Sequence, residues 1–276
     1  MTQHLESEYN ASWHVPDHKE IVASWSGLAE QFRAGSRHEA NQPYGPETCN
    51  VMDIHFPAVE RPDAAVLMFI HGGYWQSMDQ RRFSHLAQGS VDNGLITVLP
   101  TYTLCPQASV AQIIDELRLA CATVWRRFKR PIVVAGHSAG GHLAACLLAT
   151  DWPGFAPDLP HDMLQAGLGL SGLYDLEPLT HIGINDALQL NAETARASSP
   201  LFWPAPANGQ PFEAWVGGDE TSEFHRQSQE LAKAWSRQGV DAVYRSLPGT
   251  NHYNVIAALA DKESVLSARL VALARN

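Results

Sequence analysis

One pentapeptide constrains this chain more than any other feature: residues 136–140 read Gly-His-Ser-Ala-Gly, with Ser138 at the centre. Residues 131–135 before it are apolar and mostly β-branched, which is typical of a buried strand. Residues 141–149 after it are rich in alanine and leucine, which favour a helix. A G-x-S-x-G pattern between a strand and a helix indicates a sharp turn that exposes a nucleophilic serine. Ser138 is therefore a candidate catalytic residue, and the alternative is a glycine-rich turn with a structural serine.

Short apolar runs alternate with helix-like segments along the chain. The strand-like runs are residues 51–56, 64–70, 95–99, 132–135, 164–170, 212–216 and 242–247. Apolar residues recur at helical spacing in residues 18–34, 108–128, 223–237 and 255–275. This alternation predicts an α/β fold with a mostly parallel central sheet and helices on both faces.

The domain organisation follows from length and composition. The 276 residues are long enough for one domain with a large core, spanning residues 1–276. We expect residues 1–45 to form an N-terminal helical extension packed on this domain. Residues 173–210 contain four prolines and no strand pattern, so they are predicted to be an insertion of short helices near the active site. An ordinary long connection is the alternative for that segment.

Charge and composition exclude several classes of protein. The formal net charge of −10 argues against a nucleic-acid-binding protein and against binding to an anionic membrane. The apolar runs are too short for a transmembrane helix, and the first residues lack the apolar region of a signal peptide, so a cytoplasmic location is expected. Four scattered cysteines predict free thiols, and no His or Cys spacing predicts a metal site.

A serine nucleophile needs a base and an acid that orients the base. His252 follows the last predicted strand and precedes the final helix, which is where the base is expected. Asp219 and Glu220 follow the penultimate strand, and either could reach the histidine; pattern alone favours aspartate. Asp175, after an earlier strand, is a rarer position for the acid. No cofactor is expected for this chemistry.

The reaction also needs backbone N–H groups that stabilise an oxyanion. One is expected from Ala139, directly after the nucleophile. The others are expected from Gly72 and Gly73, in the loop after the predicted strand 64–70, because glycine lets the backbone approach a reacting carbonyl. His71, beside them, is expected to support this loop by hydrogen bonding.

Three motifs resemble those of one family. They are His-Gly-Gly-Tyr-Trp-Gln-Ser at 71–77, Gly-His-Ser-Ala-Gly-Gly-His at 136–142 and Ser-Glu-Phe-His-Arg-Gln-Ser at 222–228. The chain resembles the arylformamidases, or kynurenine formamidases, which are esterase/lipase-like α/β-hydrolases, from about Tyr9 to the C-terminus. In that family the catalytic aspartate precedes a Ser-Pro-Glu-Phe run. The matching position here is Glu220, so the resemblance implies Glu220 as the acid, with Asp219 as the alternative.

The resemblance implies the fold and the activity. It implies an α/β-hydrolase fold and hydrolysis of N-formyl-L-kynurenine, a small-molecule substrate, to L-kynurenine and formate. Tyr74 and Trp75 would then line the leaving-group side of the pocket by stacking, with core packing as the alternative for both. Dimers are common among such enzymes, so a homodimer is one expectation. The competing functions are a short-chain carboxylesterase, an amidase acting on another small catabolite, and a non-catalytic binding protein.

Overall fold

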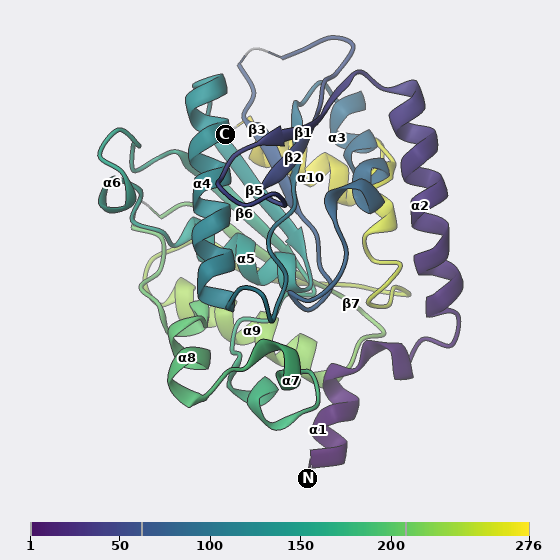
Figure 1. Cartoon of the computed structure of the whole chain (residues 1–276), viewed down its shortest axis with the longest axis vertical. Helices are drawn as coiled ribbons and strands as arrows, with labels where there is room; N and C mark the ends of the chain where they lie inside the picture. Colours follow the sequence, from purple (N-terminus) through teal and green to yellow (C-terminus); the bar gives the residue numbers. More distant parts are fainter. Residues whose placement is uncertain (1, 62, 208, 276) are drawn as a thin grey trace.

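The computed structural model describes residues 2–61, 63–207 and 209–275, which fold around an eight-stranded sheet (Figure 1). The strands are β1 (His38–Pro43), β2 (Val51–His55), β3 (Val66–Ile70), β4 (Thr97–Pro100), β5 (Ile132–His137), β6 (Leu164–Leu170), β7 (Phe212–Gly217) and β8 (Ala242–Leu247). Their order is β1-β2-β4-β3-β5-β6-β7-β8. Strand β2 is antiparallel to β1 and β4, and all other neighbouring strands are parallel. The predicted mostly parallel sheet is confirmed.

Helices cover both faces of the sheet, as predicted (Figure 1). One face carries α4 (Val110–Phe128), α5 (Ala139–Leu148) and α9 (Ser222–Ser236), and the other carries α2 (His18–Gly35), α3 (Gln88–Asp92) and α10 (Val265–Leu273). The other α-helices are α1 (Thr2–Tyr9), α6 (Trp152–Phe155), α7 (Asn185–Leu188) and α8 (Ala192–Ala197). The 3₁₀ segments are η1 (Ala11–Trp13), η2 (Gln80–Ala87), η3 (Glu177–His181), η4 (Pro200–Phe202) and η5 (Ala257–Ala260).

Strand β3 shows why a strand in the middle of the sheet is apolar along its whole length. Val66 and Met68 belong to the hydrophobic core beneath α4 and α5, whereas Leu67 and Phe69 belong to the core beneath α2 and α10. Side chains alternate between the two faces of a strand, so a strand covered on both faces favours apolar residues at every position.

Helix α4 begins at a capping box that the sequence encodes. The Ser109 hydroxyl accepts a hydrogen bond from the Gln112 N–H at 3.3 Å, and the Gln112 side chain accepts one from the Ser109 N–H at 2.8 Å. Such a cap stabilises a helix by about 1 kcal/mol. The helix ends at Phe128, and the next residue, Lys129, has a left-handed φ of 52°.

Two segments differ from the sequence-based expectation. The single helix predicted over residues 255–275 is wrong, because the chain turns after η5 and Ser264 starts a new helix by accepting a hydrogen bond from the Ser267 N–H at 3.1 Å. Residues 38–43, expected within the helical extension, form the edge strand β1. Among the described strands it pairs only with β2, and it carries mostly polar side chains, so no apolar alternation marks it.

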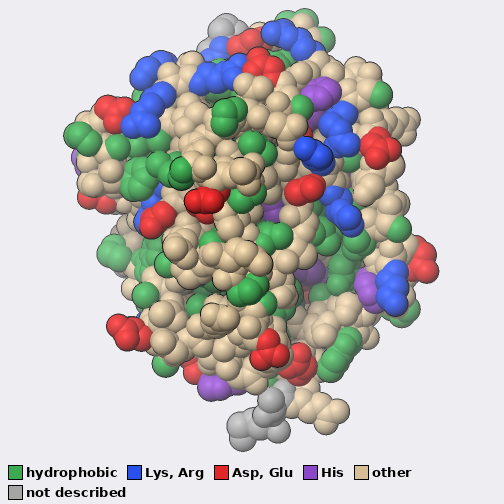
Figure 2. Space-filling view, viewed as in Figure 1, with side chains coloured by type: hydrophobic (Ala, Val, Ile, Leu, Met, Phe, Trp, Pro, Cys, Tyr) green, Lys and Arg blue, Asp and Glu red, His purple; other side chains and the backbone are tan. Residues whose placement is uncertain are grey.

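The segment 173–210 contains η3, α7, α8 and η4, and its described residues form no strand, as predicted. Figures 1 and 2, drawn from the same side, place this segment and α1 in the lower part of the molecule. Lys and Arg side chains lie mainly in the upper part and along the right edge of this face, whereas acidic side chains are visible at its lower end (Figure 2). In the described part of the chain, no helix has the length and apolarity needed to cross a membrane.

Candidate active site

Ser138 lies at a tight turn between β5 and α5, where the parallel strands end. Its φ of 56° and ψ of −119° are strained for a residue with a side chain, at a cost of about 1–3 kcal/mol. The Ser138 N–H donates to the Leu170 carbonyl at 2.8 Å, and the Ser138 carbonyl accepts from the Gly141 N–H at 2.9 Å. A β-carbon at Gly140 would lie 2.0 Å from the Ile70 carbonyl oxygen, so only glycine lets α5 start this close to β3. The sharp turn predicted from the pentapeptide is confirmed.

The glycine loop after β3 lies directly against this turn. A β-carbon at Gly72 would lie 2.8 Å from the His137 carbonyl oxygen and 3.0 Å from the β-carbon of Ser138. Gly72 and Gly73 both line the same pocket as Ser138, and Ala139 is the first residue of α5. The three residues predicted to supply oxyanion donors are therefore brought together around the serine.

His71 supports the glycine loop, as expected. Its Nδ1 donates a hydrogen bond to the Gly72 carbonyl at 2.8 Å. The ring is stacked against Tyr102, with centroids 4.5 Å apart, and against Phe83, with centroids 5.8 Å apart. Burial lowers the pKa of His71 to about 4, so the ring is neutral near pH 7.

His252, after β8, is bonded to a buried carboxylate. Its Nδ1 lies 2.7 Å from Oε2 of Glu220, whose side chain is 1% exposed. The other oxygen, Oε1, accepts hydrogen bonds from the Gly217 N–H at 2.7 Å and from the Ser171 hydroxyl at 2.5 Å. Three hydrogen bonds thus fix the carboxylate, and a fixed carboxylate holds the imidazole in one orientation.

The structure separates the two candidate acids. Asp219 has an exposed side chain, and its backbone N–H donates to the Thr250 carbonyl at 2.9 Å. Asp175 is not bonded to His252; its side chain accepts a hydrogen bond from the Glu177 N–H at 3.1 Å. Of the three carboxylates considered from the sequence, Glu220 is the one that reaches His252.

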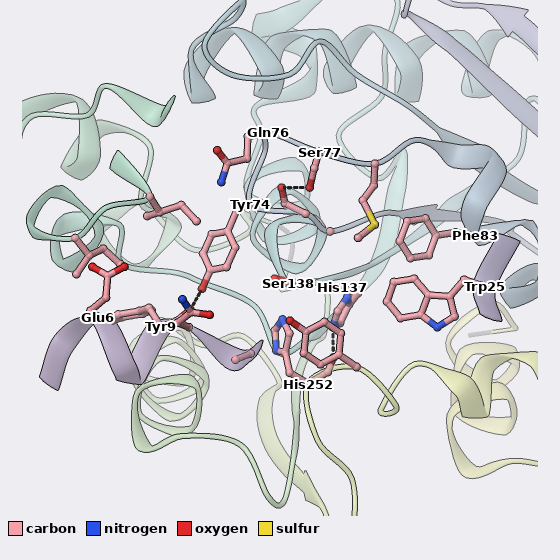
Figure 3. Close-up of a pocket in the computed structure, with 18 residues that line it drawn as sticks. Glu6, Tyr9, Trp25, Tyr74, Gln76, Ser77, Phe83, His137, Ser138 and His252 are labelled. Atoms are coloured by element: carbon pink, nitrogen blue, oxygen red, sulfur yellow. Dashed lines mark hydrogen bonds between the residues drawn. The ribbon is translucent and has the colours of Figure 1, made fainter. Parts of the chain in front are cut away.

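A cavity of about 330 Å³ opens over Ser138 and His252 (Figure 3). This volume suits a small organic ligand. Tyr74 lines the cavity, as the resemblance implies. The same expectation for Trp75 is wrong, because Trp75 is completely buried and its ring packs edge-on against His142, with centroids 5.0 Å apart. Adjacent residues of a loop point in different directions, so only one of the two aromatic rings faces the cavity.

Several residues in the cavity wall were not found from the sequence. They come from the N-terminal segment, from α2 and η2, and from the loop after His252: Glu6, Tyr9, Asn10, Trp25, Phe83 and Tyr253. Ser171, which bonds to Glu220, was also missed as a site residue. Its place at the end of a predicted strand was the signal that could have found it, whereas nothing local marks Glu6. Within the described ranges, no three His, Cys, Asp or Glu side chains are grouped to hold a metal ion.

Buried neutral histidines should make the stability depend on pH. Burial lowers the pKa of both His71 and His142 from 6.5 to about 4. Between pH 6.5 and pH 4 the unfolded chain binds more protons at these two histidines than the folded chain does. Their contribution to the free energy of unfolding is therefore complete above pH 6.5 and is lost as the pH falls toward 4. From about pH 7.5 to about pH 5 we expect the free energy of unfolding to fall by about 2 kcal/mol for each of the two histidines.

Urea denaturation at the two pH values measures this effect. A His142→Gln variant cannot take up a proton at that position, so its free energy of unfolding should fall by about 2 kcal/mol less than that of the unaltered protein. A free energy of unfolding that is the same at both pH values would contradict the prediction.

The fold and the arrangement at Ser138 define a hydrolase of the α/β-hydrolase superfamily. A family model described as BD-FAE matches residues 52–152. A kynurenine formamidase from Danio rerio is 27% identical over 91% of this chain and 86% of its own length. One from Salmo salar is 27% identical over 94% of this chain and 87% of its own length. A crystal structure of a candidate thioesterase from Silicibacter sp. TM1040 is 31% identical, with a TM-score of 0.87, over 96% of this chain and 97% of that one. The chain is thus an α/β-hydrolase that is similar to kynurenine formamidases over most of its length.

Proposed function

We propose that the chain hydrolyses N-formyl-L-kynurenine to L-kynurenine and formate, with Ser138 as nucleophile, His252 as base and Glu220 as the acid that orients it. The observation that carries the catalytic part is the 2.7 Å hydrogen bond between His252 and Glu220 at the cavity that Ser138 lines. The choice of substrate rests on the similarity to two kynurenine formamidases over most of the chain.

In the first half of the reaction, the Ser138 hydroxyl oxygen attacks the formyl carbon while His252 takes the hydroxyl proton. The negative charge that develops on the formyl oxygen is stabilised by backbone N–H groups of Ala139 and of the Gly72–Gly73 loop. The C–N bond then breaks, and His252 donates the proton to the aniline nitrogen, which leaves as L-kynurenine.

In the second half, water attacks the formyl ester on Ser138. His252 takes a proton from this water, the ester C–O bond breaks, and the proton returns to the serine oxygen. Formate leaves. The Glu220 carboxylate stabilises the positive charge that His252 carries transiently.

A short-chain carboxylesterase is the second candidate, because the cavity extends to both sides of Ser138. In Figure 3, Tyr74 and Tyr9 lie to one side of Ser138 and the apolar rings of Trp25 and Phe83 to the other. The acyl part of a formamide is a formyl group, whose carbon carries a hydrogen in place of an acyl chain. It does not need this apolar side of the cavity, whereas the acyl chain of an ester could occupy it.

Kinetics on two substrates test the proposal. We expect kcat/KM for N-formyl-L-kynurenine of about 10⁴ M⁻¹ s⁻¹ or more, which is the usual range for an enzyme acting on its own substrate. The appearance of L-kynurenine, followed by its absorbance, measures this rate, with p-nitrophenyl acetate as the ester for comparison. Cleavage of p-nitrophenyl acetate together with a formamide rate equal to that of buffer would instead assign an esterase.

A further inference from the structure

The cavity at Ser138 is lined by charge of one sign. Among the described residues that line it, Glu6 is the only Asp, Glu, Lys or Arg. The carboxylate of Glu220 does not line the cavity, because it lies behind His252 and is bonded to it. No Lys or Arg side chain of the described residues lines the cavity. An acidic group on a ligand would therefore find no Lys or Arg partner among the described residues of this wall.

The arginine of helix α9 is already paired with two carboxylates. Arg226, on α9, bonds Glu223 at 2.7 and 2.8 Å and Glu230 at 2.6 Å. These two carboxylates turn the guanidinium toward the helix surface, and Arg226 does not line the cavity. Arg226 is thus not available to bind the carboxylate of a substrate.

Glu6 is held at the cavity by the docking of α1. Tyr9 is buried, with 2% of its surface exposed, and its hydroxyl donates a hydrogen bond to Glu223 at 2.5 Å. The Thr221 hydroxyl donates a hydrogen bond to the Glu8 carbonyl at 2.5 Å. The Tyr74 hydroxyl also donates to the Tyr9 carbonyl, which joins α1 to the glycine loop. These contacts tie the helix to both α9 and the loop beside Ser138.

One oxygen of the Glu6 carboxylate remains for a ligand. Oε2 accepts a hydrogen bond from the Gly183 N–H at 2.9 Å, and within the described residues Oε1 has no hydrogen-bond donor. Figure 3 shows Glu6 at one end of the cavity and Trp25 and Phe83 at the other, with Ser138 and His252 between them. An elongated ligand can therefore have its reacting carbonyl at Ser138 while another part reaches Glu6.

We propose that Glu6 forms an ammonium-binding subsite, which selects substrates that carry a primary amine away from the scissile bond. This proposal rests on the proposed function in placing the scissile bond at Ser138. A buried or half-buried carboxylate binds an ammonium group through a charge-assisted hydrogen bond and repels a carboxylate. For a kynurenine-like substrate, the amine would lie at Glu6 and the carboxylate would face solvent.

Direct binding tests the subsite separately from catalysis. A Ser138→Ala background prevents turnover, and calorimetry measures Kd for two analogues of N-formylkynurenine, one keeping only the side-chain amine and the other only the carboxylate. We expect the amine analogue to bind at least about tenfold more tightly than the acid analogue. Glu6→Gln should remove this preference by weakening the amine analogue, while Glu20→Gln, which removes an exposed charge on α2, should leave it unchanged.

Each result decides the question. Equal affinity for the two analogues, no binding of either, or equal loss in the Glu6 and Glu20 variants would overturn the subsite. The turnover of N-formyl-L-kynurenine by the unaltered enzyme is measured separately. Absent turnover with a preserved, Glu6-dependent preference for the amine would reject the proposed substrate and keep the subsite.

Discussion

Replacing Ser138 with alanine is expected to lower kcat/KM for N-formyl-L-kynurenine by about 10⁶-fold. The variant has no atom that can attack the formyl carbon, so the covalent route is lost, and only the oxyanion donors and binding remain. The tight turn at Ser138 has positive φ, and alanine meets the same backbone strain as serine. We therefore expect the variant to fold with about the same stability.

The measurement compares steady-state rates of the two proteins, with urea denaturation as the folding control. Labelling by a fluorophosphonate gives an independent check, because the unaltered enzyme should form one covalent adduct at Ser138 and the variant none. An unlabelled native protein that still binds kynurenine analogues would favour a non-catalytic binding protein. Full activity in the Ser138 variant would reject the assignment of the nucleophile.

Replacing Glu220 with glutamine is expected to lower kcat/KM by about 10⁴-fold, as loss of the acid does in other serine hydrolases. The amide has nearly the same shape but no charge, so it does not stabilise the imidazolium that His252 becomes during the reaction. The amide has only one oxygen, so its nitrogen must face either the His252 ring or the donors at Gly217 and Ser171, and hydrogen bonds on that side are lost.

The matched control is Asp219→Asn, the neighbouring carboxylate with an exposed side chain. We expect this variant to stay within about threefold of the original kcat/KM. Glu220→Asp keeps the charge but shortens the side chain by one methylene, so it should retain more activity than Glu220→Gln. If only the Asp219 variant lost activity by orders of magnitude, the assignment of the acid would be wrong.

Much of the frame around the site was predictable because it depends on local pattern. Apolar strands, helical spacing and the turn at Ser138 are encoded by neighbouring residues, and the sheet order places the ends of β3, β5, β7 and β8 at one edge. The division of the chain into a domain, an N-terminal extension and an insertion stays a prediction. The catalytic roles stay a proposal until the variants are measured.

The errors share one physical cause. The resemblance places Trp75 in the cavity wall, but the direction of a side chain depends on the packing around the loop, and the Trp75 ring packs against His142 in the core. The edge strand β1 and the break before α10 depend on pairing and capping that apolar periodicity does not record.

By itself, the sequence determined the serine at its strand–helix turn, the histidine after the last strand, and two adjacent carboxylates, of which the resemblance implied Glu220. These follow from chain order and from the residue types that a tight turn accepts. Only the tertiary structure decided that Glu220 and not Asp219 reaches His252, and that Glu6 lies in the wall of the same cavity. The reason is distance along the chain: Glu6 and Ser138 are brought together by the docking of α1 on α9 and on the glycine loop, and no local pattern in the sequence encodes that contact.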